Sequence, residues 1–151
     1  MKLFLAGTID NGKSGNWQKE LIEALSGTDI EIYNPRRDDF PEHPKDEDVI
    51  SQIRWEQDHL DAADFIIMVF QKESKSPITL LELGLYAQSK KLGVFCDRKY
   101  WRFLNVSETC RKYNIPFMTN TDIDCIATVT KSMNYAFNYM NKKYEEVQSI
   151  H

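Results

Sequence analysis

The chain has 151 residues, of which 42% are hydrophobic and 28% charged, and its formal net charge is −4 at pH 7. This balance predicts a single globular domain over residues 1–151 that folds without metal ions or disulfide staples. The positive charges are dispersed, which argues against a protein whose main work is to bind nucleic acid. No stretch is apolar for long enough to span a bilayer, so no membrane association is expected. Three cysteines without CxxC spacing indicate reduced thiols in a cytoplasmic protein: Cys96, Cys110 and Cys125.

The first half of the chain alternates strand and helix. Residues 2–6 form a short apolar run that predicts a buried strand, and a Gly- and Asn-rich loop leads from it into helical spacing between Trp17 and Gly27. Residues 30–34 alternate as a strand does. A proline-rich stretch follows, and then a helix is expected over 47–62. Its expected inner side consists of Val49, Ile53, Leu60 and Ala63.

The second half continues the alternation. Residues 65–70, "FIIMVF", are apolar at every position, which is typical of a central parallel strand covered on both faces. Ser76 followed by Pro77 predicts the start of a helix, with the serine as its cap, that continues to about Lys91. Residues 92–96 are the next strand. The remaining expected elements are a helix ending near Tyr113, a strand at 115–118 and a long helix over about 122–147.

Five alternations of strand and helix imply an α/β fold, with a doubly wound five-stranded parallel sheet and right-handed crossovers. In such folds ligands bind beyond the carboxyl ends of the strands. Four loops should therefore carry the function: 7–16, 34–40, 71–77 and 96–105.

Glu82 is the most informative charged residue, because it lies in the apolar segment "SPITLLELGLYA". Helical periodicity places it with Thr79 and Tyr86 on what looks like a half-exposed side, which favours an ordinary surface carboxylate. Its position just after the central strand, among several leucines, instead favours a carboxylate that can attack an electrophilic carbon. Periodicity alone leaves both interpretations open.

Other candidate residues also have two interpretations. The glycines of the first loop have neither GxGxxG nor P-loop spacing, so this loop is either an anion site or a flexible turn. Arg37 and Asp39 in "NPRRDDF" either bind a phosphate or base edge or pair locally in solvent. Asp64 is either a turn former or a proton donor. The histidines lack zinc-ligand spacing, so no metal is expected.

Five segments together resemble the nucleoside 2-deoxyribosyltransferase-like family over nearly the whole chain: "FLAGTID", "NPRRDDF", "AADFIIMVF", "SPITLLELGLYA" and "FCDRKYWRFLNV". The resemblance implies a flavodoxin-like (Rossmann-like) fold. It implies cleavage of the N-glycosidic bond of a nucleoside or nucleotide, often a 2′-deoxy one, without a cofactor.

The resemblance also implies roles for individual residues. Glu82 would be the nucleophile that forms a glycosyl-enzyme, and Asp64 would protonate the leaving base. Ser76 stands where several transferases carry an aspartate and where relatives that hydrolyse deoxynucleoside 5′-monophosphates bind phosphate. The substrate would contact these further residues: Gly7, Thr8, Asp10, Arg37 and Asp39.

In the family, an asparagine eight positions after an aspartate enters a neighbouring subunit's site. Asp97 and Asn105 have this spacing. The resemblance therefore implies a homodimer or larger assembly with shared sites. The leading expectation is a transferase that passes deoxyribose to another base. The alternatives are a monophosphate N-glycosidase and a non-catalytic nucleotide-binding module.

Overall fold

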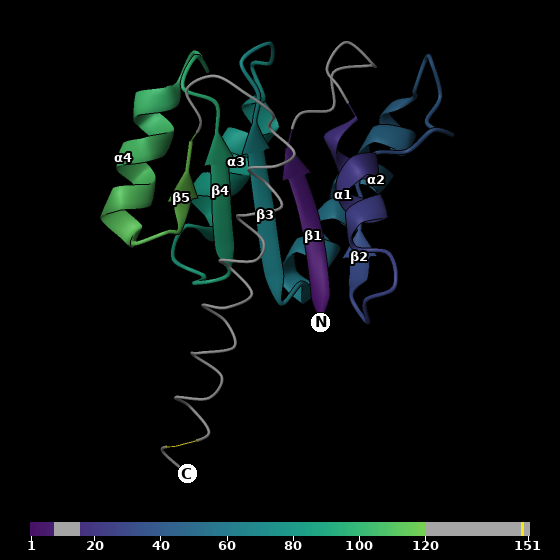
Figure 1. Cartoon of the computed structure of the whole chain (residues 1–151). Coiled ribbons are helices and arrows are strands. Elements are labelled where there is room, and N and C mark those ends of the chain that lie inside the picture. The colour runs from purple at the N-terminus through teal and green to yellow at the C-terminus, as the bar shows by residue number, and fades with distance from the viewer. Residues whose placement is uncertain (8–15, 120–148, 150–151) are drawn as a thin grey trace.

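The protein is described by a computed structural model over residues 1–7, 16–119 and 149 (Figure 1). Thr8, Asp10, Cys125 and the helix expected over 122–147 lie outside these ranges. Five parallel strands form one sheet in the order β2-β1-β3-β4-β5. The strands are β1 (Lys2–Gly7), β2 (Glu31–Tyr33), β3 (Phe65–Phe70), β4 (Leu92–Cys96) and β5 (Phe117–Met118).

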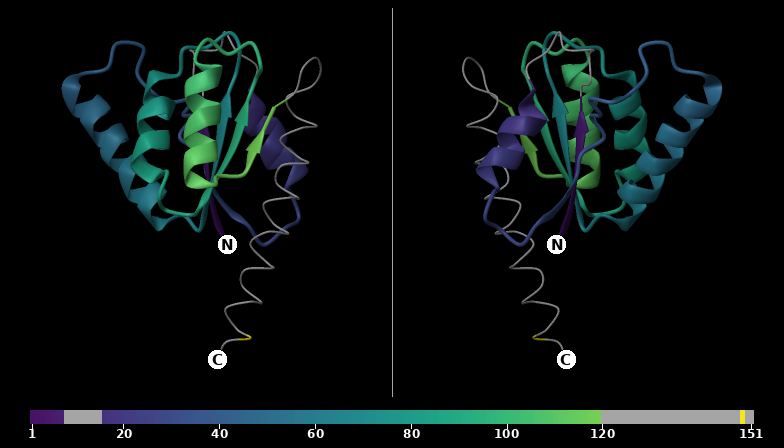
Figure 2. Two further views of the ribbon diagram at one scale, coloured as in Figure 1. Left: turned by 90° about the vertical axis from the view of Figure 1, so that its left-hand side faces the viewer. Right: turned by 90° about the vertical axis from the view of Figure 1, so that its right-hand side faces the viewer.

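Helices cover both faces of this sheet, as the alternation of elements predicts (Figure 2). One face carries α1 (Trp17–Ala24), and the other carries α2 (Asp46–Ala62), α3 (Pro77–Tyr86) and α4 (Phe103–Tyr113). The strand order is that of the flavodoxin-like doubly wound fold, which reverses direction of winding between β1 and β3. The expected fold class is thereby confirmed. No helix within the described ranges combines the length and the apolar character needed to cross a bilayer.

The central strand β3 is buried at all six positions, as its unbroken apolar sequence predicts. Successive side chains alternate between two cores. Ile67 and Val69 pack in the core that contains Trp17 of α1. Ile66 and Met68 pack in the larger core beneath the other three helices.

Gly7 ends β1 at a point where no side chain fits. A Cβ atom there would lie 2.7 Å from the carbonyl oxygen of Val69 and 2.8 Å from the ring of Trp17. The glycine thus lets α1 and the neighbouring strand close tightly on the carboxyl end of β1.

The inner side of α2 differs from the prediction. Leu60 is buried as expected, but Val49 and Ile53 are 38% and 46% exposed. The half-buried side instead carries polar residues, including Gln52 and Glu56. The prediction was therefore right for Leu60 and for Ala63, which is 5% exposed, and wrong for Val49 and Ile53.

Helix α3 ends at Tyr86, earlier than the expected Lys91. The chain turns before β4, and Lys90 adopts a left-handed conformation with φ of 62°. The ammonium group of Lys91 then donates hydrogen bonds to three carbonyl oxygens at the end of α2, those of Leu60, Asp61 and Ala63. These bonds satisfy backbone acceptors that the end of a helix leaves unpaired.

Two of the cysteines lie within the described residues. Cys96 and Cys110 are buried free thiols, and burial raises the pKa of each to about 12. Both thiols are therefore un-ionised at neutral pH.

Candidate active site

Glu82 lies in the second turn of α3, on the buried side of the helix. Its exposed fraction is 8%, and that of Thr79 on the same side is 4%. The residues that point outward are Leu81 and Leu85, which are 58% and 65% exposed. The expectation of a half-exposed surface carboxylate is therefore wrong. Because α3 begins directly after the carboxyl end of β3, this carboxyl group is buried near the edge where such folds bind ligands.

A second carboxyl group acts on the first. Burial, as the main cause, and the negative charge of Glu56 on α2 together raise the pKa of Glu82 to about 8. Burial also raises the pKa of Glu56, while a hydrogen bond from Gln52 works in the opposite direction. Two carboxyl groups coupled in this way resist ionising together, so the pair retains a proton more readily than either would in water.

Glu56 was not identified from the sequence. The available signal was its spacing from Gln52, one helical turn away on the side of α2 that faces the protein. A polar pair at this spacing on the inner side of a helix is uncommon unless the two groups have partners. Glu56 was missed because apolar residues were predicted to form the inner side of α2.

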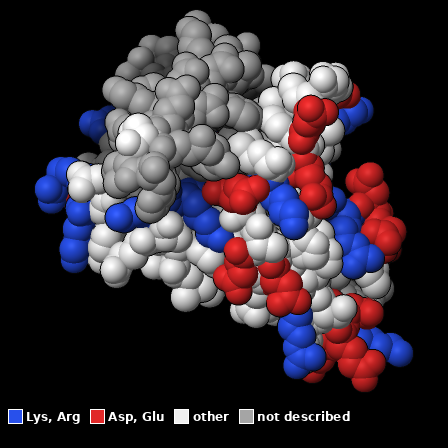
Figure 3. Space-filling model, turned by 90° about the horizontal axis from the view of Figure 1, so that it is seen from below, with Lys and Arg blue, Asp and Glu red and all other residues white. Residues whose placement is uncertain are grey.

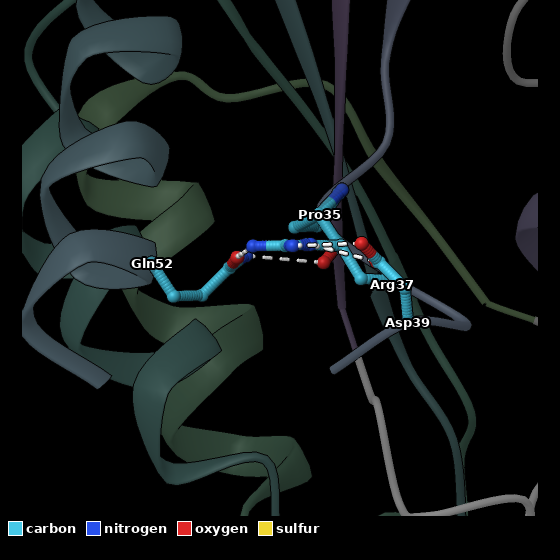
Figure 4. A network of polar contacts seen from close by, with 4 residues as sticks. All are labelled: Pro35, Arg37, Asp39 and Gln52. Atoms are coloured by element: carbon cyan, nitrogen blue, oxygen red, sulfur yellow. Dashed lines mark hydrogen bonds and ion pairs between the residues drawn. The ribbon is translucent and has the colours of Figure 1, made fainter. Parts of the chain in front are cut away.

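Gln52 links Glu56 to the loop after β2, and its contacts with that loop are drawn in Figure 4. Its amide nitrogen donates to Glu56 Oε1 at 2.9 Å and to the Pro35 carbonyl oxygen at 3.2 Å. Its amide oxygen accepts from Arg37 Nη1 at 3.4 Å. Arg37 in turn makes two hydrogen bonds of 3.0 Å to the Asp39 carboxylate. Arg37 lowers the pKa of Asp39 through these bonds, so the pair is ionised.

The loop before α3 holds two buried hydroxyl groups together. Ser74 and Ser76 are 3% and 7% exposed, and their Oγ atoms lie 2.7 Å apart. Ser76 occupies the cap position of α3, as predicted, and has φ of 45°, but its side chain makes no capping hydrogen bond. The turn instead places its hydroxyl beside that of Ser74 at the start of the helix.

The loop after β4 fixes the loop before α3. The Tyr100 hydroxyl and the Trp101 indole N–H both donate to the Lys75 carbonyl oxygen, at 2.6 and 3.0 Å. The carboxyl ends of β3 and β4 are thus tied to each other next to Ser76. Close by in the sequence, Gln71 follows β3 directly, and its buried amide oxygen has no partner among the described residues.

Asp64 lies at the opposite edge of the sheet. It precedes β3, is exposed, and accepts a hydrogen bond of 2.7 Å from the backbone N–H of Lys2. The six residues of β3 span about 20 Å, too far for a proton transfer to the Glu82 edge. The expectation that Asp64 acts as proton donor at this site does not fit that position.

Figure 3 views this amino edge of the molecule, where acidic and basic side chains intermingle over the described part. A hollow of about 260 Å³ also lies at this edge, between the ends of α3 and α4, and its walls include Lys90, Tyr113 and Asn114. Glu82 is not among the residues that line this hollow.

Asn105 is exposed in the first turn of α4, on the same face of the sheet as α3. Asp97, the residue whose spacing drew attention to it, accepts a hydrogen bond of 2.8 Å from the Lys99 N–H and closes a turn. Two of the expected substrate-binding residues, Arg37 and Asp39, are connected by hydrogen bonds through Gln52 to Glu56. Gly7 and Ser76 lie at the ends of adjacent strands.

The fold and site define a flavodoxin-like α/β protein in which a buried carboxyl group on α3 is coupled to a half-buried one on α2. The chain belongs to the nucleoside 2-deoxyribosyltransferase-like family, whose sequence pattern matches residues 1–100. The matched segment contains Glu56, Ser76 and Glu82.

Two solved structures share this fold. One is a 2-deoxyribosyltransferase from Bacillus psychrosaccharolyticus, with 17% identity and a TM-score of 0.59 over 81% of this chain and 87% of that one. The other is the CMP N-glycosidase BcmB of Clostridium botulinum, with 14% identity and a TM-score of 0.59 over 89% and 99%. At these identities the likeness shows the fold alone. No curated protein matches the chain by sequence.

Proposed function

We propose that the protein cleaves the N-glycosidic bond of a (2′-deoxy)nucleoside or nucleotide and transfers the deoxyribose to another base. Glu82 is the nucleophile and Glu56 is the proton donor. The observation that carries this proposal is the burial of Glu82 beside a second carboxyl group, at the ligand-binding edge of the sheet. Family membership and the activities named for the two structural relatives support it.

In the first step, the ionised Glu82 carboxylate attacks C1′ of the sugar, and the bond from C1′ to the base nitrogen breaks. The electron pair of that bond leaves with the base, which takes the proton held by Glu56. A covalent glycosyl-glutamate remains. In the second step, an acceptor base attacks C1′ and the ester bond to Glu82 breaks, while Glu56 recovers a proton from the acceptor. One proton shared by two carboxyl groups suits this cycle.

Hydrolysis is the alternative to transfer, with water as the acceptor and a nucleoside 5′-monophosphate as substrate. Ser76 supports it, because its hydroxyl is beside that of Ser74 at the start of α3. The amino end of a helix carries a partial positive charge that favours a phosphate group.

A shared site between subunits belongs to the same proposal. The outward side of α3 exposes three large apolar residues at helical spacing, Ile78, Leu81 and Leu85, each more than half exposed. Such a stripe is suited to contact with a second copy of the chain. Asn105 is exposed on the same face of the sheet and would enter the partner's site from there.

The test is incubation with deoxynucleosides and their monophosphates, with and without an acceptor base, followed by chromatography of the products. Wild-type protein should release free base, and a mass increase of one deoxyribosyl group should map to Glu82. Glu82→Ala should abolish release, whereas Glu47→Gln, an exposed glutamate on α2, should not. Equal release by wild-type and Glu82→Ala protein would contradict the mechanism. A new nucleoside that forms only with acceptor present indicates transfer.

A second candidate function is a non-catalytic nucleotide-binding module. The raised pKa of Glu82 supports it, because a protonated carboxyl group donates a hydrogen bond to a ribose hydroxyl. This function predicts that a nucleotide raises the melting temperature without being consumed.

A further inference from the structure

Each of the three observed contacts of the Gln52 side-chain amide joins a hydrogen-bond donor to an acceptor. The two N–H groups point to two acceptors, the Pro35 carbonyl oxygen and Glu56 Oε1, and the oxygen meets a donor on Arg37. If the amide were turned over, its oxygen would face two acceptors and its N–H groups would face a guanidinium donor. The three partners therefore allow only one orientation.

The partners of Gln52 come from different parts of the fold. Arg37 and Pro35 belong to the loop after β2, and Arg37 is fixed by two hydrogen bonds to Asp39 (Figure 4). Glu56 lies one turn further along α2. A single amide thus connects a loop at the ligand-binding edge to one member of the carboxyl pair.

The donated hydrogen bond also affects charge. It stabilises the ionised form of Glu56, against the effect of burial. The more Glu56 is ionised, the more its charge keeps the proton on Glu82. The proposed reaction requires the reverse distribution, with Glu82 ionised and Glu56 protonated.

We propose that Gln52 is a positioning residue of this site, whose amide orients the Glu56 carboxyl group and determines which member of the Glu56–Glu82 pair holds their shared proton. In the free protein, the bond from Gln52 holds Glu56 as the anion and leaves the proton on Glu82. A substrate that engages Arg37 withdraws the donor that fixes the Gln52 oxygen. The amide is then free to turn away from Glu56, and the proton moves to the residue that must deliver it. This role rests on the proposed function.

The charged and titratable groups around the pair come from each neighbouring element. Arg37 and Asp39 face Gln52 from the loop after β2, and Asp48 acts on Arg37 from the first turn of α2. Glu82 acts on Tyr86 within α3, and the Tyr86 hydroxyl donates to Asp61 near the end of α2.

His59 lies one turn beyond Glu56 on α2, stacks on Trp55 and meets Tyr33 edge to face. Its Nδ1 contacts the Trp55 carbonyl oxygen at 2.7 Å, so this nitrogen is engaged by its own helix. Substituting Gln52 removes none of these groups, so a change in titration after substitution reports on the amide.

The experiment is a carbon-13 NMR titration of the glutamate carboxyl groups in the free protein, assigned with Glu56→Gln and Glu82→Gln. Gln52→Met keeps the length of the side chain but removes both donors and the acceptor. The midpoint of Glu56 should move upward by about one pH unit, as expected for loss of a hydrogen bond to a charged acceptor. The midpoint of Glu82 should fall. Gln57→Met, on the exposed side of the same helix, should leave both midpoints unchanged.

Unchanged midpoints in folded Gln52→Met protein would overturn the proposal. If that variant does not fold, Gln52→Glu provides the same test, because an ionised carboxylate cannot donate to Glu56 and its charge should raise the midpoint further. In kinetics, Gln52→Met should move the alkaline limb of the kcat/KM profile, which reports the free enzyme, upward by a similar amount. A purely structural role would lower the amplitude without moving the limb. The titration needs no substrate, so it remains decisive even if base release proves independent of Glu82.

Discussion

The charge of Glu56 on α2 raises the pKa of Glu82 on α3, although a whole strand and two loops separate the two residues in the chain. The pairing exists because α2 and α3, which follow β2 and β3, pack on the same face of the sheet (Figure 2). Neither residue has an ion-pair partner among the described residues, so burial is the main cause of both shifts.

The stability of the protein should fall as the pH rises from about 5 to 8. The pKa of Glu82 rises on folding from its ordinary value of 4.5 to about 8. The folded state therefore binds more protons than the unfolded state in this range. The stability that Glu82 contributes is fully present below pH 4.5 and is lost as the pH rises through 8. The loss is on the order of a few kcal/mol. Denaturant unfolding at several pH values should show this slope in wild-type protein and a much smaller one in Glu82→Gln. Equal slopes in both proteins would refute the assignment.

Glu56→Gln should slow base release by about 10²–10⁴-fold, because general acid catalysis is lost. A substrate whose leaving group needs no proton, such as an aryl deoxyriboside, should lose much less. The rate for both substrates is measured under saturating conditions. Asp64→Asn serves as the comparison, since Asp64 bonds to the Lys2 backbone at the far edge of the sheet. It should leave the rate unchanged, and a large loss there would restore Asp64 as the donor.

Ser76→Ala should discriminate between nucleoside and monophosphate substrates. If the Ser76 hydroxyl binds phosphate, its removal should raise KM for the monophosphate by about 10–100-fold, as for a hydrogen bond to a charged group. KM for the nucleoside should change little. Ser107→Ala, which removes an exposed hydroxyl on α4, is the control. Equal effects of Ser76→Ala on both substrates would exclude a phosphate-specific role.

Gly7→Ala should destabilise the fold strongly. The added methyl group would lie 2.7 Å from the Val69 carbonyl oxygen and 2.8 Å from the Trp17 ring, so strand or helix must move. We expect a loss of about 1–3 kcal/mol, typical of overpacking. At Gly84, on the exposed side of α3, no atom lies within 4 Å of the added Cβ. Gly84→Ala should therefore raise the melting temperature slightly, because alanine favours helix. Similar melting temperatures for the two variants would contradict the packing at Gly7.

Leu81→Arg should disrupt self-association if the outer stripe of α3 is the subunit contact. Leu81 is 58% exposed in the single chain, and an arginine there would place a charge within an apolar contact. Light scattering should show a lower mass for the variant, with loss of base release because Asn105 no longer reaches a partner. Lys19→Glu, on the opposite face of the sheet, should change neither. A monomeric wild-type protein with full activity would rule out the shared site.

Much of the fold could be read from local patterns. β3 was predicted at its observed bounds, because a strand buried on both faces is apolar at every position. The start of α3 at Pro77 and the bounds of β4 were also correct. The early end of α3 was missed, since the residues up to Lys91 remain compatible with a helix and only the return to β4 stops it.

The sequence by itself determined the α/β order, the family and Glu82 as the candidate nucleophile, because local periodicity and motif spacing are properties of neighbouring residues. Only the tertiary structure decided that Glu82 is buried, that Asp64 lies at the opposite edge, and that Glu56 is coupled to Glu82 and bonded to Gln52. These facts depend on how helices from separate crossovers pack on one face of a sheet. Burial and charge coupling act through space, and their consequences for a carboxyl group appear only when distant segments are brought together.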